Sequence, residues 1–144
     1  MASHDTPKCI LLRGNPICKE GKSGASLTPG MLATLNAAGL LVPHPTAGGV
    51  ASPTFVREAA YIGKTINDVF ASGDTVPVMT CRTGDEVFAI LEDGNNVSIG
   101  AFLESAGDGT LQLLADGAPV AKALQAVNTA GGSVATARIK VEVL

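Results

Sequence analysis

The sequence is poor in the residue types on which most enzyme chemistry depends. Among its 144 residues it has no tryptophan, two histidines and three cysteines. His4 lies near the N-terminus, and His44 lies between two prolines with no orienting partner nearby in the sequence. Because general acid–base catalysis and zinc binding rely most often on histidine, we expect no catalytic residue, no metal site and no cofactor. We interpret His44 as an exposed or lightly packed loop residue.

Charge and aromatic residues are also sparse. Charged residues make up 16% of the chain, the net charge is −3, and aromatic residues account for 3%. Nucleic-acid binders need clustered Lys and Arg, and single-strand binders need stacking platforms, so we expect no nucleic-acid partner. No apolar run approaches the roughly 20 residues of a spanning helix, and the first residues do not form a secretory signal. We therefore expect no membrane partner, and synthesis in the cytoplasm.

The three cysteines, Cys9, Cys18 and Cys81, are odd in number and too few for a disulfide scaffold. We expect them to be reduced and to serve as buried small apolar residues. Two segments imitate the end of a phosphate-binding loop, Gly21-Lys22-Ser23 and Gly63-Lys64-Thr65. The motif also needs an earlier glycine, and Pro16 and Glu58 occupy those positions. Both segments are interpreted as turns.

Glycine, in contrast, is abundant, with 17 residues that punctuate the chain. From Gly73 onward, short apolar runs are separated by pairs of Gly with Asp or Asn. These residues favour tight turns, and turns at this spacing are typical of an all-β barrel or sandwich. We therefore predict a mostly β fold.

Two runs give clear strand predictions. Residues 138–143 alternate polar and apolar side chains, which predicts a C-terminal strand with one buried face. Residues 87–91 are apolar throughout, which predicts a central strand covered on both faces. We expect residues 75–82 to pair with that central strand, and Pro77 to mark an edge or a bulge. Residues 117–128 remain open between strand and helix, although we favour a hairpin partner for the last strand.

The first half of the chain has weaker signals. We expect one short strand at Cys9 to Arg13, one possible helical turn around Met31 to Asn36, and loose passages elsewhere. We predict that residues 1–53 form an extended N-terminal arm and a loosely structured segment, and that residues 54–144 form a β-barrel-like domain. The apolar residues of the arm should be buried against something, which can be another chain.

Several passages together resemble the head decoration (capsid cement) proteins of tailed double-stranded DNA bacteriophages, over most of residues 26–144. These passages occupy residues 26–32, 48–49, 58–64, 72–76, 97–100, 103–111 and 137–144. The resemblance implies a small β-barrel or β-tulip-like domain with at most one or two short helices. It also implies a homotrimer, with a dimer as the alternative.

By this resemblance, the chain is a non-enzymatic virion protein on the capsid exterior, made in the host cytoplasm. It would stabilise the expanded head by bridging subunits of the major capsid protein, with the N-terminal arm adding to capsid loops. The arm residues that we expect to contact the partner are Cys9, Ile10, Leu11, Leu12, Arg13 and Ile17.

Two alternatives remain open. One is another phage structural or assembly component, such as a tail-tube or head-completion β protein. The less favoured one is a small β-barrel enzyme or carrier domain, which would need a concave pocket with clustered polar groups.

Overall fold

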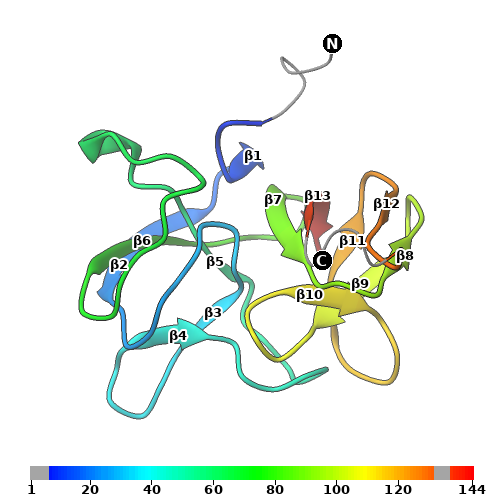
Figure 1. Ribbon diagram of the computed structural model, residues 1–144, viewed down its shortest axis with the longest axis horizontal. Helices are drawn as coiled ribbons and strands as arrows, with labels where there is room; N and C mark the ends of the chain where they lie inside the picture. The colour runs from blue at the N-terminus through cyan, green and yellow to red at the C-terminus, as the bar shows by residue number, and fades with distance from the viewer. Residues whose placement is uncertain (1–6, 132–136) are drawn as a thin grey trace.

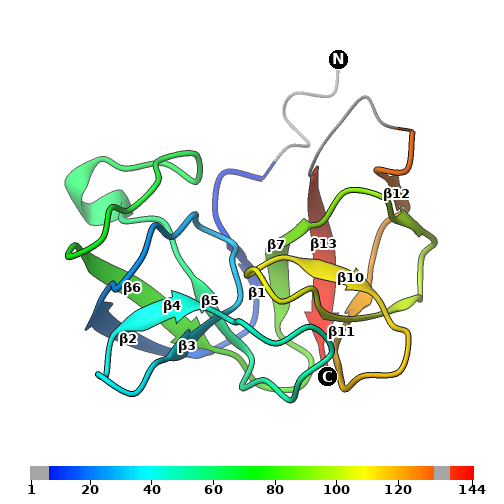
Figure 2. The ribbon, with the colours of Figure 1, turned by 60° about the horizontal axis from the view of Figure 1, so that its bottom comes forward.

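The computed structural model describes residues 7–131 and 137–144. The described chain is mostly β and contains no α-helix; its one helical element is a single 3-10 turn, η2 (Ala60–Ile62). Its strands form two groups that lie side by side, one built largely from the first half of the chain and one from the second (Figures 1 and 2). The prediction of a mostly β fold is confirmed.

The second group is a five-stranded barrel. Neighbouring strands follow the order β7-β10-β9-β11-β13, and β13 pairs again with β7 to close the ring. Its strands are β7 (Glu86–Leu91), β9 (Phe102–Ser105), β10 (Leu111–Leu113), β11 (Pro119–Ala123) and β13 (Ala137–Val143). A two-stranded ladder of β8 (Asn96–Val97) and β12 (Val127–Asn128) accompanies the barrel.

Residue alternation explains the barrel interior. Along β13, Ile139, Val141 and Val143 are buried while the residues between them are partly exposed, as predicted. Strand β7 is buried from Val87 to Leu91, which confirms that it is covered on both faces. Strand β11 pairs antiparallel with β13, which confirms a strand partner for the last strand within residues 117–128. The two strands do not form a simple hairpin, because β12 lies between them and pairs with β8.

The first group surrounds a three-stranded antiparallel sheet in the order β2-β6-β5, beside a hairpin of β3 and β4. These strands are β2 (Ile17–Lys22), β3 (Ala33–Leu35), β4 (Leu41–Pro43), β5 (Thr54–Val56) and β6 (Thr75–Thr80). One face of the sheet, with Phe55 and Met79, joins the apolar core of the barrel. The other face, with Val56 and Val78, packs in a separate cluster with Leu41 of the hairpin.

The expected pairing of residues 75–82 with the central barrel strand is wrong. Strand β6 pairs with β2 and β5, so Pro77 lies in the middle strand of a sheet rather than at its edge. The proline is tolerated because β5 ends at Val56. The Arg57 N–H still donates to the Pro77 carbonyl at 2.9 Å, and the missing Pro77 N–H would fall just beyond the last residue of β5.

The first 53 residues contain more strands than their sequence predicts. Strand β1 (Leu11–Arg13) pairs antiparallel with β7 of the barrel, as Figure 2 shows, and β2, β3 and β4 follow it. The possible helical turn around Met31 to Asn36 is wrong, because β3 occupies this segment and pairs with β4. The division of the chain into an arm over 1–53 and a domain over 54–144 stays a prediction.

Candidate partner-binding surface

The predicted contact segment Cys9 to Arg13 lies against the barrel of its own chain. The Phe88 N–H donates to the Ile10 carbonyl at 2.8 Å, and the Ile10 N–H donates to the Glu58 carboxylate at 3.2 Å. The Ile10 side chain is fully buried in the barrel core. This segment therefore joins the two groups of strands, because Glu58 follows β5 and Phe88 belongs to β7.

The six predicted contact residues differ in how much they offer to a partner. Cys9, Arg13 and Ile17 are exposed, and Ile17 exposes 49% of its surface. Leu11 and Leu12 are half-buried against the barrel core. The structure keeps residues 9–13 together on β7 but places Ile17 on the separate sheet, at the start of β2. That these residues contact a partner stays a prediction.

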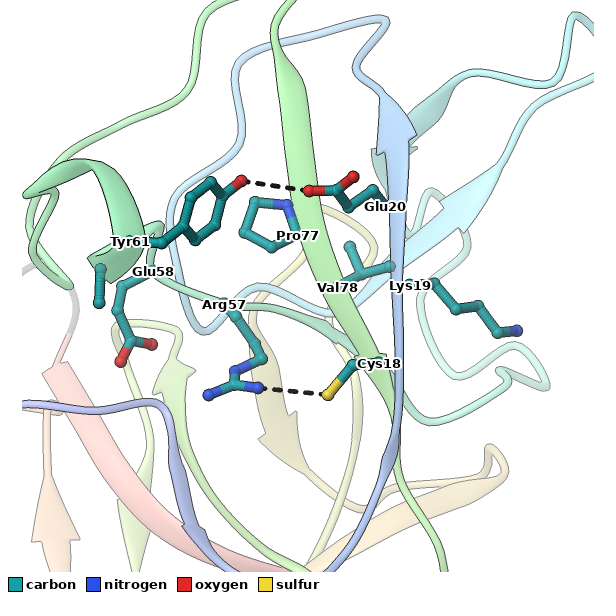
Figure 3. A pocket seen from close by; sticks show the side chains of 9 residues that line it. Cys18, Lys19, Glu20, Arg57, Glu58, Tyr61, Pro77 and Val78 are labelled. Atoms are coloured by element: carbon teal, nitrogen blue, oxygen red, sulfur yellow. Dashed lines mark hydrogen bonds between the residues drawn. The ribbon is translucent and has the colours of Figure 1, made fainter.

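A pocket of about 480 Å³ opens on the barrel-facing side of β2 and β6 (Figure 3). Arg57 Nη1 donates to the Cys18 sulfur at 3.3 Å, and the Tyr61 hydroxyl donates to the Glu20 carboxylate at 3.3 Å. Glu58 turns away from these groups toward Ile10. The sequence did not reveal this pocket, because Cys18 and Arg57 are far apart in the chain and belong to no motif.

A second pocket, of about 310 Å³, lies on the opposite side of the same sheet. Its apolar wall comes from the hairpin, through Ala33, Leu35 and Leu41, and its polar wall comes from Thr54 and Thr80 of the sheet. Lys19 lines this pocket, and its side chain points away from Cys18 and Glu20 in Figure 3. Strand β2 is therefore flanked by a pocket on each face.

Three ionisable groups in or near the first pocket, Cys9, Tyr61 and Cys81, have raised pKa values. Partial burial and the neighbouring Glu58 carboxylate raise the pKa of the Cys9 thiol. Burial and Glu20 likewise raise the pKa of Tyr61. Burial raises the pKa of Cys81 to about 12. Since the thiolate is the reactive form of cysteine, these shifts favour the unreactive thiol. Only Cys81 is buried as predicted, whereas Cys9 and Cys18 are exposed.

His44 corrects another expectation, because it is buried rather than exposed or lightly packed. Its Nδ1 lies 2.7 Å from the Ser105 hydroxyl, and its Nε2 lies 3.2 Å from the Val50 carbonyl oxygen. Because the Val50 carbonyl oxygen can only accept, Nε2 donates to it, and the Ser105 hydroxyl, which also accepts the Gly107 N–H at 3.2 Å, donates to Nδ1. Ser105 is fully buried. The pair fastens the loop after β4 to the barrel and offers no accessible nucleophile.

Two further observations concern residues 7–131 and 137–144. No helix in these ranges is long and apolar enough to cross a membrane. Nor do three His, Cys, Asp or Glu side chains gather there in a way that could hold a metal ion.

Comparison with known proteins places the fold. No family model and no curated protein matches the sequence. Among solved structures the chain is similar to a small head-fibre domain of a bacteriophage. That structure is the N base of head fiber gp8.5 in bacteriophage phi29, with a TM-score of 0.59 and 9% sequence identity. The match covers 90% of this chain and 95% of that chain, so the two share a fold over nearly their whole lengths.

Proposed function

We propose that this chain is a structural protein of a phage head, which binds the outer surface of the capsid and stabilises the expanded head by bridging major capsid protein subunits. The observation that carries the proposal is the shared fold with the head fiber base of phage phi29, over 90% of this chain. The sequence passages that resemble capsid decoration proteins indicate the same part of the virion.

The surface of the chain supports a role in an assembly. Nine large hydrophobic side chains are exposed among the described residues, and Tyr61, Ile62 and Val69 lie on the one loop between β5 and β6. A surface loop with three exposed apolar side chains is a candidate for coverage by a partner. We propose that other copies of the chain and the capsid surface bury these apolar side chains, and that the favoured oligomer is a homotrimer.

The test of capsid binding uses undecorated expanded capsids and unexpanded capsids as a control. We expect the protein to co-sediment with the expanded shells at saturable stoichiometry and to raise the temperature at which those shells disassemble. Co-sedimentation with purified tails instead, and with neither kind of shell, would favour the tail-tube alternative. Binding to no virion part would contradict the proposal.

The arm residues can be tested with the fold left intact, since Arg13 and Ile17 are exposed. We expect Arg13→Ala combined with Ile17→Asp to weaken capsid binding at least tenfold without lowering the melting temperature. Arg82→Ala combined with Ile99→Asp is the matched control, because Arg82 and Ile99 are exposed elsewhere. Equal losses for both pairs would show that the arm has no special role.

The oligomeric state is tested by size-exclusion chromatography with light scattering on the purified protein and on protein released from capsids. The proposed trimer has three times the chain mass of 14.5 kDa. A stable dimer in both samples would contradict the trimer but leave capsid binding standing.

A further inference from the structure

Strand β2 forms an edge of the three-stranded sheet. It pairs with β6 on one side, and on the other side β4 meets it only at its end, through a parallel bridge between Ser23 and Leu41. Five of its six residues are exposed. Only beyond the end of the strand, at Gly24, does a backbone N–H reach the hairpin, at the Leu41 carbonyl. As far as the Lys22 N–H, β2 therefore presents an open hydrogen-bonding edge, and β4 covers the edge beyond that point.

The register identifies which backbone groups this edge offers. The Arg57 N–H donates to the Pro77 carbonyl, so the backbone N–H and C=O positions of Pro77 face β5. Because these groups alternate sides along a strand, those of Met79 also face β5, whereas those of Val76 and Val78 face β2. The residues opposite Val76 and Val78 then face β6, and the alternate residues of β2 face outward. The outward groups that stay free are the N–H and C=O of Cys18 and Glu20 and the N–H of Lys22, because the bridge at Ser23 places Leu41 beside the Lys22 carbonyl.

Both faces of this edge carry a pocket that a neighbouring strand could fill. The pocket on the hairpin side has an apolar wall of Ala33, Leu35 and Leu41, which suits an aliphatic side chain. Recognition by strand addition uses this arrangement, in which main-chain hydrogen bonds provide affinity and alternate side chains enter pockets on the two faces.

The pocket on the barrel side contains Arg57, whose hydrogen-bonding groups are only partly satisfied. The described partner of the Arg57 guanidinium is the Cys18 thiol at 3.3 Å, and the buried Nε of Arg57 has no hydrogen-bond partner. A thiol is a weak acceptor, whereas guanidinium groups bind carboxylates strongly. The one salt bridge among the described residues joins Lys122 and Glu142 on the barrel. A carboxylate opposite Cys18 would lie beside Arg57.

We propose that the outer edge of β2 binds an extended segment of a partner protein whose side chains alternate between acidic or basic residues and aliphatic ones. This inference goes beyond capsid attachment and does not depend on it. Opposite residues in a ladder share a face, so the segment has an acidic residue opposite Cys18, an aliphatic residue opposite Lys19 and a basic residue opposite Glu20. An aliphatic residue opposite Gly21 and an acidic one opposite Lys22 complete the pattern. The pattern reads the same in both directions, so it applies to parallel and antiparallel addition.

A second copy of the chain fits this edge poorly. Two β2 strands related by a two-fold axis pair in registers that keep each residue on its own face of the sheet. The two registers with the longest overlap place Lys19 opposite Lys19 or Glu20 opposite Glu20. Like charges directly opposite each other destabilise a strand pair. The charges on the edge therefore favour a different chain as the occupant.

The first experiment uses the capped peptide Thr-Asp-Val-Lys-Val-Asp-Thr as a probe and the charge-reversed peptide Thr-Lys-Val-Asp-Val-Lys-Thr as its control. NMR hydrogen exchange on the full chain measures the outward amides. We expect saturating probe to slow exchange of the Cys18, Glu20 and Lys22 amides at least tenfold, and the control peptide to bind at least tenfold more weakly. Unchanged exchange of these amides at millimolar probe, or equal binding of the two peptides, would overturn the proposal.

Variants separate main-chain from side-chain recognition. Glu20→Pro removes an outward N–H and leaves the β6 ladder intact, so we expect it to abolish probe binding. Glu20→Ala keeps that N–H and should still bind. If Glu20→Pro does not fold, Arg57→Met provides the test, because it should reduce the preference for the probe over its charge-reversed control at least fivefold. An unchanged preference in Arg57→Met would overturn the assignment of the acidic position. Amide protection that rises with protein concentration, without probe, would show that a second copy occupies the edge.

Discussion

The barrel and the sheet beside it bury their apolar residues in different ways. The barrel closes its ladder through β7 and β13, and its core receives buried residues from all five strands. The β2-β6-β5 sheet is open and has only eight buried residues in its own cluster. Phe55 and Met79 of the sheet, and Cys81 just after β6, pack in the barrel core. The difference indicates that the barrel holds itself together, whereas the sheet depends on the barrel.

The largest expected effect lies at the closure of the barrel. Val141 is fully buried opposite Val87, so Val141→Asp places an unpaired charge in the core. We expect the free energy of unfolding to fall by roughly 5 kcal/mol or more, which is enough to unfold a domain of ordinary stability. Glu142→Ala is the control on the same strand. It removes a half-exposed salt bridge to Lys122 and should cost under about 1 kcal/mol. A near-normal melt of Val141→Asp would show that the strand faces are assigned wrongly.

The dependence of the sheet on the barrel is tested at Phe55, which is fully buried in the shared core. We expect Phe55→Ala to lower the free energy of unfolding by about 3–5 kcal/mol. Native-state hydrogen exchange should show the amides of β2 and β6 losing more protection than those of β11 and β13. Equal losses of amide protection in both groups of strands would mean that the barrel and the sheet unfold as one unit, which would contradict the inferred difference between them.

A smaller effect is expected where a polar contact fastens the loop after β4 to the barrel. Ser105→Ala removes the hydroxyl that binds His44 Nδ1 and the Gly107 N–H, both in buried or partly buried surroundings. We expect the free energy of unfolding, measured by chemical denaturation, to fall by about 1–3 kcal/mol. Ser98→Ala is a control, because Ser98 is exposed on a barrel loop. A loss no larger than in that control would show that this contact does not stabilise the junction.

The smallest effect is a pH dependence at Cys81, which lies in the shared core. Its pKa is raised from 9.0 to about 12 by burial. The unfolded chain loses the thiol proton near pH 9 while the folded chain keeps it, so stability falls as pH rises from 9 toward 12. We expect the free energy of unfolding of Cys81→Ala to fall less steeply over pH 9–10 than that of the unchanged chain. Parallel slopes would contradict the burial of this thiol.

The sequence predicted the barrel better than the sheet, for a physical reason. Strand β13 shows strict alternation and β7 is apolar throughout, and both patterns are local consequences of where the side chains point. Strand β2 reads Ile-Cys-Lys-Glu-Gly-Lys, in which no apolar alternation exists, because most of its residues are exposed. Its pairing with β6 joins segments more than fifty residues apart, and no local pattern encodes such a partner.

The errors in pairing have the same origin. The turn Thr83-Gly84-Asp85 resembles a hairpin connection, and Asp85 does accept the Arg82 N–H at 2.9 Å. The chain nevertheless crosses there from the sheet to the barrel, since the edges of β7 are taken by β13, β1 and β10. The pocket at Arg57 could not be predicted from the sequence for a related reason, because only these long-range strand pairings bring its residues together.

The position of β1 has a consequence for the order in which the chain can mature during synthesis. Residues 11–13 pair with β7, and β7 in turn pairs with β13 at the other end of the chain. The first strand must therefore wait while more than seventy residues are made, and the ring closes only after the last strand has left the ribosome. Closure between strands so far apart in the sequence is slow. A chain interrupted before β13 would keep the edges of β7 and β11 unpaired and prone to association with other chains, so only copies that include β13 can close the barrel.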